Sequence, residues 1–197
     1  MKKKMNLPNK LTLLRMIIVV IIIILALLPA GRSFGFWKLE FDYRMLSILV
    51  LFAVGSYTDH LDGHIARKNN LVTTFGKFMD PIADKLLVNS LFIILTGMGR
   101  IHWLVTVIMV SRDIIVDVIR LIMVERGTVI AASIWGKLKT VAQMIALILV
   151  LALPVPDGHW LNIVTNIFTY IAAFISLMSG FDYFWKNKKV LLEDVLS

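Results

Sequence analysis

The chain has 197 residues, of which 58% are hydrophobic and 17% are charged, and its formal net charge is +8. This composition is too apolar for an ordinary soluble domain, and the length suffices for one compact membrane domain. The absence of cysteine excludes disulfides, thiolate catalysis and cysteine-based zinc sites. In a membrane protein, the positive charge favours anionic lipid headgroups as partners over nucleic acid.

Six apolar segments follow one another along the chain, each long enough to cross about 30 Å of hydrocarbon. They lie near residues 11–30, 43–66, 77–98, 101–124, 136–153 and 159–184. The pattern predicts an all-α integral membrane fold, a bundle of about six transmembrane helices. We expect one membrane domain, residues 1–185, followed by a short cytoplasmic tail, residues 186–197.

Basic residues are distributed unequally between the two sides of these segments. Most lie in the termini and in the turns on the same side, whereas the opposite side carries Arg32, Lys38, Arg44 and Arg100. Because basic loops tend to remain in the cytoplasm, both termini are expected there. The five tryptophans fall at predicted segment ends, as is typical of membrane interfaces. We therefore expect a multi-pass protein of the cell membrane.

The beginning of the first segment is polar on one face. Asn9, Thr12 and Arg15 follow at i, i+3 and i+6, so they share one side of a helix. This spacing, and the lack of a clear cleavage site after the apolar run, argue against a cleaved signal peptide. One interpretation is an interfacial cap in which Arg15 extends to the lipid headgroups.

Four aspartates flank the turn between the second and third segments, in an apolar context where carboxylates are costly. Asp59 and Asp62 fall on one stripe of a helix, and Asp80 and Asp84 fall on one stripe of the next. Two antiparallel helices could bring these stripes together, and a hard divalent cation would compensate their charge. Solvated charges paired with nearby lysines and arginines are the alternative, but they have no reason to keep helical spacing. The pattern predicts a metal site.

Residues 59–84 contain the string D-x-x-D-G-x-x-A-R, then eight residues, then G-x-x-x-D-x-x-x-D. This string resembles the signature of the CDP-alcohol phosphotransferases. The chain as far as about Phe184 is similar to the bacterial branch of that family that makes phosphatidylglycerophosphate. The segments that carry this second resemblance are residues 7–15, 70–73, 136–140 and 179–184.

The resemblance implies transfer of the phosphatidyl group of CDP-diacylglycerol to glycerol 3-phosphate, with release of CMP, at an active site facing the cytoplasm. It assigns metal ligation to Asp59, Asp62 and Asp80, with one or two Mg²⁺ or Mn²⁺ ions. Asp84 would be the general base and a second-metal ligand. The residues that it assigns to CDP-diacylglycerol binding are Asn9, Thr12, Arg15, Gly63, Ala66, Arg67 and Gly76. Family members suggest a homodimer. For the small residues Gly63, Ala66 and Gly76, the alternative role is to allow close packing between helices.

Cations in the fourth and fifth segments indicate an anionic acceptor. They are Arg112, Arg120, Lys137 and Lys139. Intramembrane arginines are costly without an anion, and a guanidinium can donate two parallel hydrogen bonds to a phosphate. Glycerol 3-phosphate fits this arrangement. The alternative is internal pairing, of Arg112 with Asp113 and of Arg120 with Asp117.

Some residues depart from the family pattern. Asp113 and Asp117 stand where relatives more often carry a glutamate and a small residue, and His60 and His64 stand where relatives usually carry aromatic residues. The two histidines project away from the stripe of Asp59, so we expect them to pack rather than to bind metal.

Two other functions fit parts of the pattern. A sister enzyme could use another acceptor, such as phosphatidylglycerol in a cardiolipin synthase of this family. A cation transporter would bind its ion at intramembrane aspartates, but it needs access from both faces and often has two similar halves. The four aspartates gather toward one face and the halves show no similarity, so the transferase is favoured.

Overall fold

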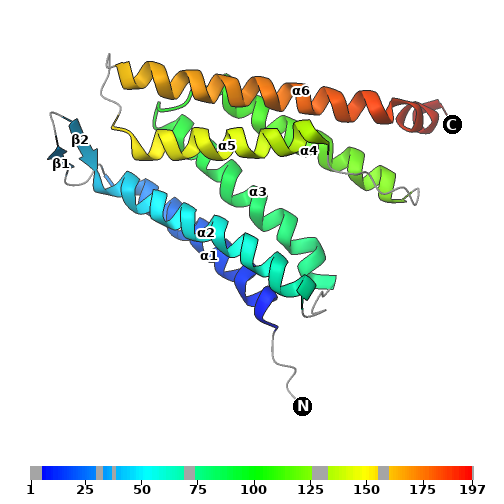
Figure 1. Ribbon diagram of the computed structural model, residues 1–197, viewed down its shortest axis with the longest axis horizontal. Helices are drawn as coiled ribbons and strands as arrows, with labels where there is room; N and C mark the ends of the chain where they lie inside the picture. The colour runs from blue at the N-terminus through cyan, green and yellow to red at the C-terminus, as the bar shows by residue number, and fades with distance from the viewer. Residues whose placement is uncertain are drawn as a thin grey trace. The chain divides into compact units, whose positions relative to one another are not determined.

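The structure, a computed structural model, describes residues 6–29, 33–36, 39–68, 74–125, 133–154 and 160–196. Within these residues the chain forms six helices and one β-hairpin (Figure 1). The helices are α1 (Leu7–Leu27), α2 (Tyr43–Lys68), α3 (Thr74–Gly97), α4 (Trp103–Glu125), α5 (Ile134–Ala152) and α6 (Trp160–Leu196). The predicted all-α membrane fold is confirmed.

Helix boundaries agree closely with the apolar segments, with differences at the two ends of the chain. Helix α1 begins at Leu7 rather than near residue 11, because Pro8 occupies its first turn, where a missing N–H costs nothing. Helix α6 continues to Leu196, so residues 186–196 extend the last helix.

A β-hairpin, which the sequence did not predict, precedes α2. Its strands, β1 (Ser33–Phe36) and β2 (Leu39–Asp42), pair antiparallel with Phe36 opposite Leu39. The aromatic residues Phe34, Phe36 and Phe41 favour an extended backbone. Asp42 then accepts a hydrogen bond from the Arg44 backbone N–H at 2.8 Å, at the start of α2.

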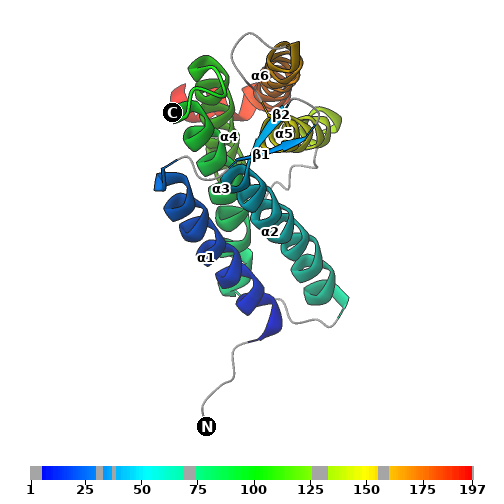
Figure 2. The same ribbon diagram turned by 90° about the vertical axis from the view of Figure 1, so that its left-hand side faces the viewer.

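The chain divides into two compact units, and the first contains α1, α2 and most of α3. Helices α1 and α2 run side by side in opposite directions, as both views show (Figures 1 and 2). Ile18 and Ile22 of α1, Phe52 of α2 and Leu87 of α3 are among the buried core residues. A Cβ on Gly55 of α2 would lie 2.8 Å from Leu87 Cδ2, so this glycine permits close packing against α3.

The second unit contains the end of α3 and helices α4, α5 and α6, with α4 packed against α6. The turn from α3 to α4 depends on Gly99, whose φ of +71° is readily adopted by glycine. The Gly99 N–H donates to the Thr96 carbonyl at 2.9 Å, which closes the C-terminal end of α3.

The helices expose large apolar side chains, opposite to the pattern of a soluble protein. Ile17 of α1 is 55% exposed, Ile114 of α4 is 58% exposed and Phe174 of α6 is 63% exposed. Among the described residues, three stretches are long and apolar enough to cross a membrane: Leu7–Leu27, Ile134–Ala152 and Trp160–Lys188. Apolar surface of this extent requires lipid or protein to cover it, and the chain is a membrane protein.

Candidate functional site

Three of the four predicted metal-binding aspartates have described side chains, and all three belong to the first unit. Asp59 lies near the end of α2 and Asp80 near the start of α3, and both are half-buried. Asp84 is exposed and follows Asp80 by one turn. Pro81 between them removes one backbone N–H from the helix ladder.

Two side chains from adjacent turns of helix α1 contact two of these carboxylates. The Thr12 hydroxyl donates to Asp80 Oδ1 at 2.5 Å, and Arg15 Nη1 lies 2.8 Å from Asp59 Oδ1. Thr12 and Arg15 are both 0% exposed. Because they are spaced i, i+3, one face of α1 holds carboxylates from α2 and α3 together.

Arg15 is held in place from a second direction. Its Nε donates to the Gly55 carbonyl at 3.3 Å, and Gly55 also accepts from the Thr58 hydroxyl at 2.7 Å. The interpretation of Arg15 as a side chain extending to lipid headgroups does not fit, because it is fully buried against α2. A buried guanidinium beside Asp59 instead provides a fixed countercharge for that carboxylate.

The carboxylates suit a hard cation by their chemistry. Carboxylate oxygens are the ligands that Mg²⁺ prefers, and each contact from α1 uses one oxygen of its aspartate. Hydrogen bonds to a ligating carboxylate fix its orientation, which raises metal affinity. Among the side chains that the structure describes, no three His, Cys, Asp or Glu residues are grouped as a complete metal site. The side chain of Asp62, the fourth predicted ligand, is not among those that the structure describes.

The structure describes only the backbone of several other residues that the sequence analysis singled out in α2. They are Gly63, Ala66, Arg67, His60 and His64. Of the remaining residues predicted to bind the nucleotide lipid, Asn9 is half-buried in α1 and Gly76 is buried in α3.

A second charged cluster lies in the other unit, between α4, α5 and α6. Asp113 is 4% exposed and accepts from Lys139 Nζ at 2.7 and 3.0 Å and from Arg112 Nη1 at 3.1 Å. This arrangement matches the alternative of internal pairing between Arg112 and Asp113, and it adds Lys139, which the sequence did not connect to Asp113. A buried carboxylate between two cations is well compensated.

Arg112 also contacts α6, where its Nη2 donates to the Ser179 hydroxyl. Its Nε is buried and has no hydrogen-bond acceptor among the described residues. Gly180 leaves room for the stem of this arginine, because a Cβ there would lie 3.2 Å from Arg112 Cγ. The described residues therefore satisfy only part of the hydrogen-bonding capacity of this guanidinium.

Arg120 is exposed and contacts Tyr183 of α6, and Lys137 at the start of α5 is exposed. The sequence did not single out Tyr183 or Ser179 as site residues. Their i, i+4 spacing was the available signal, because it places both on one face of α6, in a segment that carried the family resemblance.

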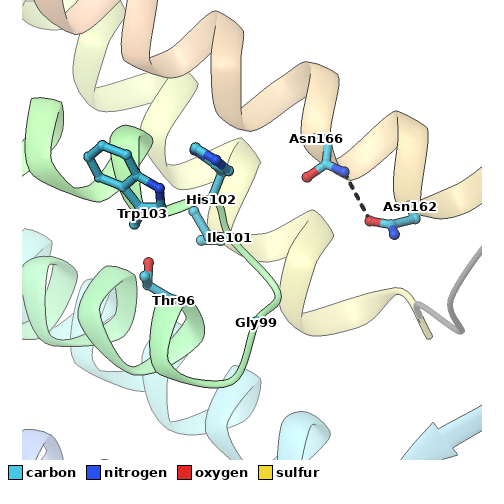
Figure 3. A pocket seen from close by; sticks show the side chains of 7 residues that line it. All are labelled: Thr96, Gly99, Ile101, His102, Trp103, Asn162 and Asn166. Atoms are coloured by element: carbon cyan, nitrogen blue, oxygen red, sulfur yellow. Dashed lines mark hydrogen bonds between the residues drawn. The ribbon is translucent and has the colours of Figure 1, made fainter.

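A polar pocket lies at the other end of the second unit. Its volume is about 370 Å³, and it is lined by Thr96, Gly99, Ile101, His102, Trp103, Asn162 and Asn166. Figure 3 shows these residues coming from the end of α3, the start of α4 and α6, with Asn166 donating to Asn162 at 3.0 Å. None of the lining residues that the structure describes is an aspartate, glutamate, lysine or arginine. This described lining therefore offers no charged group for phosphoryl chemistry.

Comparison with known proteins gives a consistent result across nearly the whole chain. A family model described as CDP-alcohol phosphatidyltransferase matches residues 5–178. The chain is 38% identical over 191 residues to the CDP-diacylglycerol–glycerol-3-phosphate 3-phosphatidyltransferase of Bacillus subtilis, covering 94% of this chain and 97% of that protein. The protein of the same name from Rickettsia bellii is 37% identical over 190 residues, 96% and 99% of the two chains. That of Haemophilus influenzae is 35% identical over 196 residues, 98% of each.

Proposed function

The chain belongs to the CDP-alcohol phosphatidyltransferase family, and from this membership we infer that it is a CDP-diacylglycerol–glycerol-3-phosphate 3-phosphatidyltransferase. It transfers the phosphatidyl group of CDP-diacylglycerol to glycerol 3-phosphate and releases CMP. The observation that carries this conclusion is identity of 35% to 38% to relatives of that name over nearly the full length of both chains.

We propose that Asp59, Asp62 and Asp80 bind one or two Mg²⁺ or Mn²⁺ ions, with Asp84 as a further ligand. The contacts from Thr12 to Asp80 and from Arg15 to Asp59 support this proposal, because they would orient the ligands before the metal arrives. When bound, the cation supplies positive charge for the pyrophosphate and for the departing CMP.

The proposed nucleotide-lipid site surrounds these carboxylates. Its members are Asn9, Thr12, Arg15, Gly63, Ala66, Arg67 and Gly76. Arg15 and Thr12 act there through the aspartates that they contact, since both are fully buried. The small residues would allow the nucleotide close to the helix backbones, and Arg67 would meet a phosphate.

Asp84 is the proposed general base. Its exposed position on α3 suits a group that must meet a soluble acceptor. The carboxylate takes the proton of the acceptor hydroxyl, and the freed oxygen attacks the phosphorus on the lipid side of the pyrophosphate. A new P–O bond forms to glycerol 3-phosphate as the bond to the CMP oxygen breaks, and CMP leaves with the bridging oxygen.

Arg112, Arg120, Lys137 and Lys139 form the proposed site for the acceptor phosphate. Support comes from the buried Nε of Arg112, which lacks an acceptor among the described residues, and from the exposure of Arg120 and Lys137. Lys139 contributes through Asp113, whose charge it balances. Arg112 is thereby less strongly neutralised by Asp113, which leaves it more available to a phosphate.

The proposed setting is the cell membrane, with the active site and both termini in the cytoplasm and the surrounding membrane lipids in contact with the exposed apolar faces. The basic residues of the termini support this orientation. A homodimer is also proposed, by analogy with the family, and anionic lipids rather than nucleic acid are the proposed partners of the positive charge.

Acceptor choice is tested directly with purified protein. The protein is supplied with CDP-diacylglycerol and Mg²⁺, and CMP release is compared for glycerol 3-phosphate, phosphatidylglycerol, inositol and serine. We expect CMP with glycerol 3-phosphate and none above background with the others. CMP release with phosphatidylglycerol alone would identify a cardiolipin-type enzyme instead.

A further inference from the structure

Tyr183 lies at the centre of the second charged cluster. It is 1% exposed on α6, and the guanidinium carbons of Arg120 and Arg112 lie 5.2 and 5.7 Å from its ring centroid. Both distances are within the range of cation–π attraction. One aromatic ring therefore contacts two arginines that are two helical turns apart on α4.

The hydroxyl of Tyr183 adds a directional contact. It accepts from Arg120 Nη2 at 2.8 Å and, more weakly, from the Ser133 backbone N–H at 3.5 Å just before α5. Gly136 in the first turn of α5 faces the same ring, because a Cβ there would lie 3.5 Å from Tyr183 Cε2. Tyr183 thus connects the start of α5 with α4 and α6.

The hydrogen bond between Arg120 and Tyr183 joins a charged group to a neutral one. Asp113 faces Arg112 and Lys139, and Arg120 Nη2 donates to the neutral hydroxyl of Tyr183. A neutral acceptor fixes the direction of a guanidinium without cancelling its charge. The contact with Tyr183 therefore orients Arg120 without placing a further negative charge beside it.

We propose that Tyr183 is a positioning residue that holds Arg120 and Arg112 in the geometry that receives the phosphate of the acceptor. This inference rests on the proposed function, and it deepens the acceptor site with a residue that does not itself touch the phosphate. Arg120 would otherwise be a long, exposed side chain with several rotamers. Ordering it before the acceptor arrives reduces the entropic cost of binding.

Tyr183→Phe is the primary test, because it removes the hydroxyl and keeps the ring. We expect the KM for glycerol 3-phosphate to rise about tenfold, the order of one charge-assisted hydrogen bond. The KM for CDP-diacylglycerol and the turnover at saturating glycerol 3-phosphate should change little. Tyr183→Leu, which also removes the ring, should raise the KM further.

A double-variant cycle separates positioning from general structural support. Arg120→Ala alone should raise the KM for glycerol 3-phosphate about tenfold to a hundredfold. If Tyr183 acts through Arg120, adding Tyr183→Phe to that variant should have little further effect. Full additivity of the two changes would overturn the proposal.

Tyr170→Phe is the matched control, because it makes the same chemical change on the same helix at a residue that is 45% exposed. It should leave both KM values unchanged. An unaltered KM for glycerol 3-phosphate in Tyr183→Phe would overturn the proposal. Loss of folding in that variant would do the same, because a hydroxyl facing an exposed guanidinium should be dispensable for folding.

Failure of the proposed function is recognised separately, in the parent protein. If the parent releases CMP with another acceptor and not with glycerol 3-phosphate, the acceptor assignment is wrong. The Tyr183 variants are then compared with that acceptor. A raised KM for an anionic acceptor would still support the positioning role, and an unchanged KM would overturn it.

Discussion

Several buried charges among the described residues face partners of opposite charge, and these pairs constrain the roles of the individual residues. Arg15 is fully buried beside Asp59, and Lys139 is almost fully buried beside Asp113. Removing one member of a buried pair typically costs about 3–5 kcal/mol. Variants of Asp59 or Asp113 therefore risk unfolding the protein, which makes residues with neutral partners better probes of chemistry.

Asp80 is such a probe, because it accepts a hydrogen bond from the neutral hydroxyl of Thr12. Asp80→Asn should nearly abolish CMP release and weaken Mg²⁺ binding while the protein remains folded in detergent, since an amide lacks the charge that holds the cation. Mg²⁺ binding is measured by its effect on thermal unfolding, and CMP release by a turnover assay. Excess EDTA should abolish turnover of the parent protein, and full activity in EDTA would contradict the metal proposal.

Asp84 should behave differently from Asp80 if its main role is to take the acceptor proton. Asp84→Asn should lower turnover by a factor of about 10² or more, the usual scale for loss of a general base. Binding of CDP-diacylglycerol in the presence of Mg²⁺ should survive better than in Asp80→Asn. Equal loss of binding in the two variants would mean that Asp84 acts chiefly as a metal ligand.

Residue spacing predicted part of this site and missed the rest. Helical periodicity placed Asp80 and Asp84 on one stripe of α3, and Thr12 and Arg15 on one face of α1. The contact between Thr12 and Asp80 joins residues far apart in the chain, and local spacing carries no information about it. Tyr183 was missed for the same reason, because its role depends on α4 and α6 packing together.

At the level of whole elements, α1 does more than span a membrane. Its exposed face is apolar and its opposite face carries two buried polar side chains that contact α2 and α3. The helix therefore positions the aspartates as well as anchoring the chain. Apolar segments of about twenty residues identify such helices readily in a sequence. The hairpin of β1 and β2 gave a weaker signal, because its strands have four residues each.

The positioning role of α1 predicts the effect of Thr12→Val, which keeps the shape of the side chain and removes the hydroxyl. We expect Mg²⁺ affinity to fall about tenfold to a hundredfold, the usual range for residues that orient metal ligands. Thr169→Val is the matched control, because Thr169 is equally buried and its hydroxyl donates to the Asn166 carbonyl of its own helix. Equal Mg²⁺ affinity in the parent and Thr12→Val would show that α1 does not orient Asp80.

For the whole molecule, the two ends of the second unit carry different chemistry. His102, Trp103 and Asn162 line a pocket whose described lining has no aspartate, glutamate, lysine or arginine, whereas the arginines and Tyr183 lie further along α4 and α6. Asn162 and Lys186 are both on α6, separated by about 36 Å along the helix, which is enough to cross the hydrocarbon core. One end should therefore face the cytoplasm and the other the outside.

The proposed orientation rests on the distribution of basic residues, and it can be measured on the intact molecule. Because the chain has no cysteine, single substitutions His102→Cys and Lys186→Cys report their own positions without background. Both residues are exposed and lie outside the proposed catalytic groups. A membrane-impermeant maleimide should label His102→Cys in intact cells, and Lys186→Cys after the membrane is opened, because basic segments remain in the cytoplasm. The reverse pattern would put Arg120 and Tyr183 on the outer side, where the enzyme could not meet cytoplasmic glycerol 3-phosphate, and it would overturn the proposed orientation.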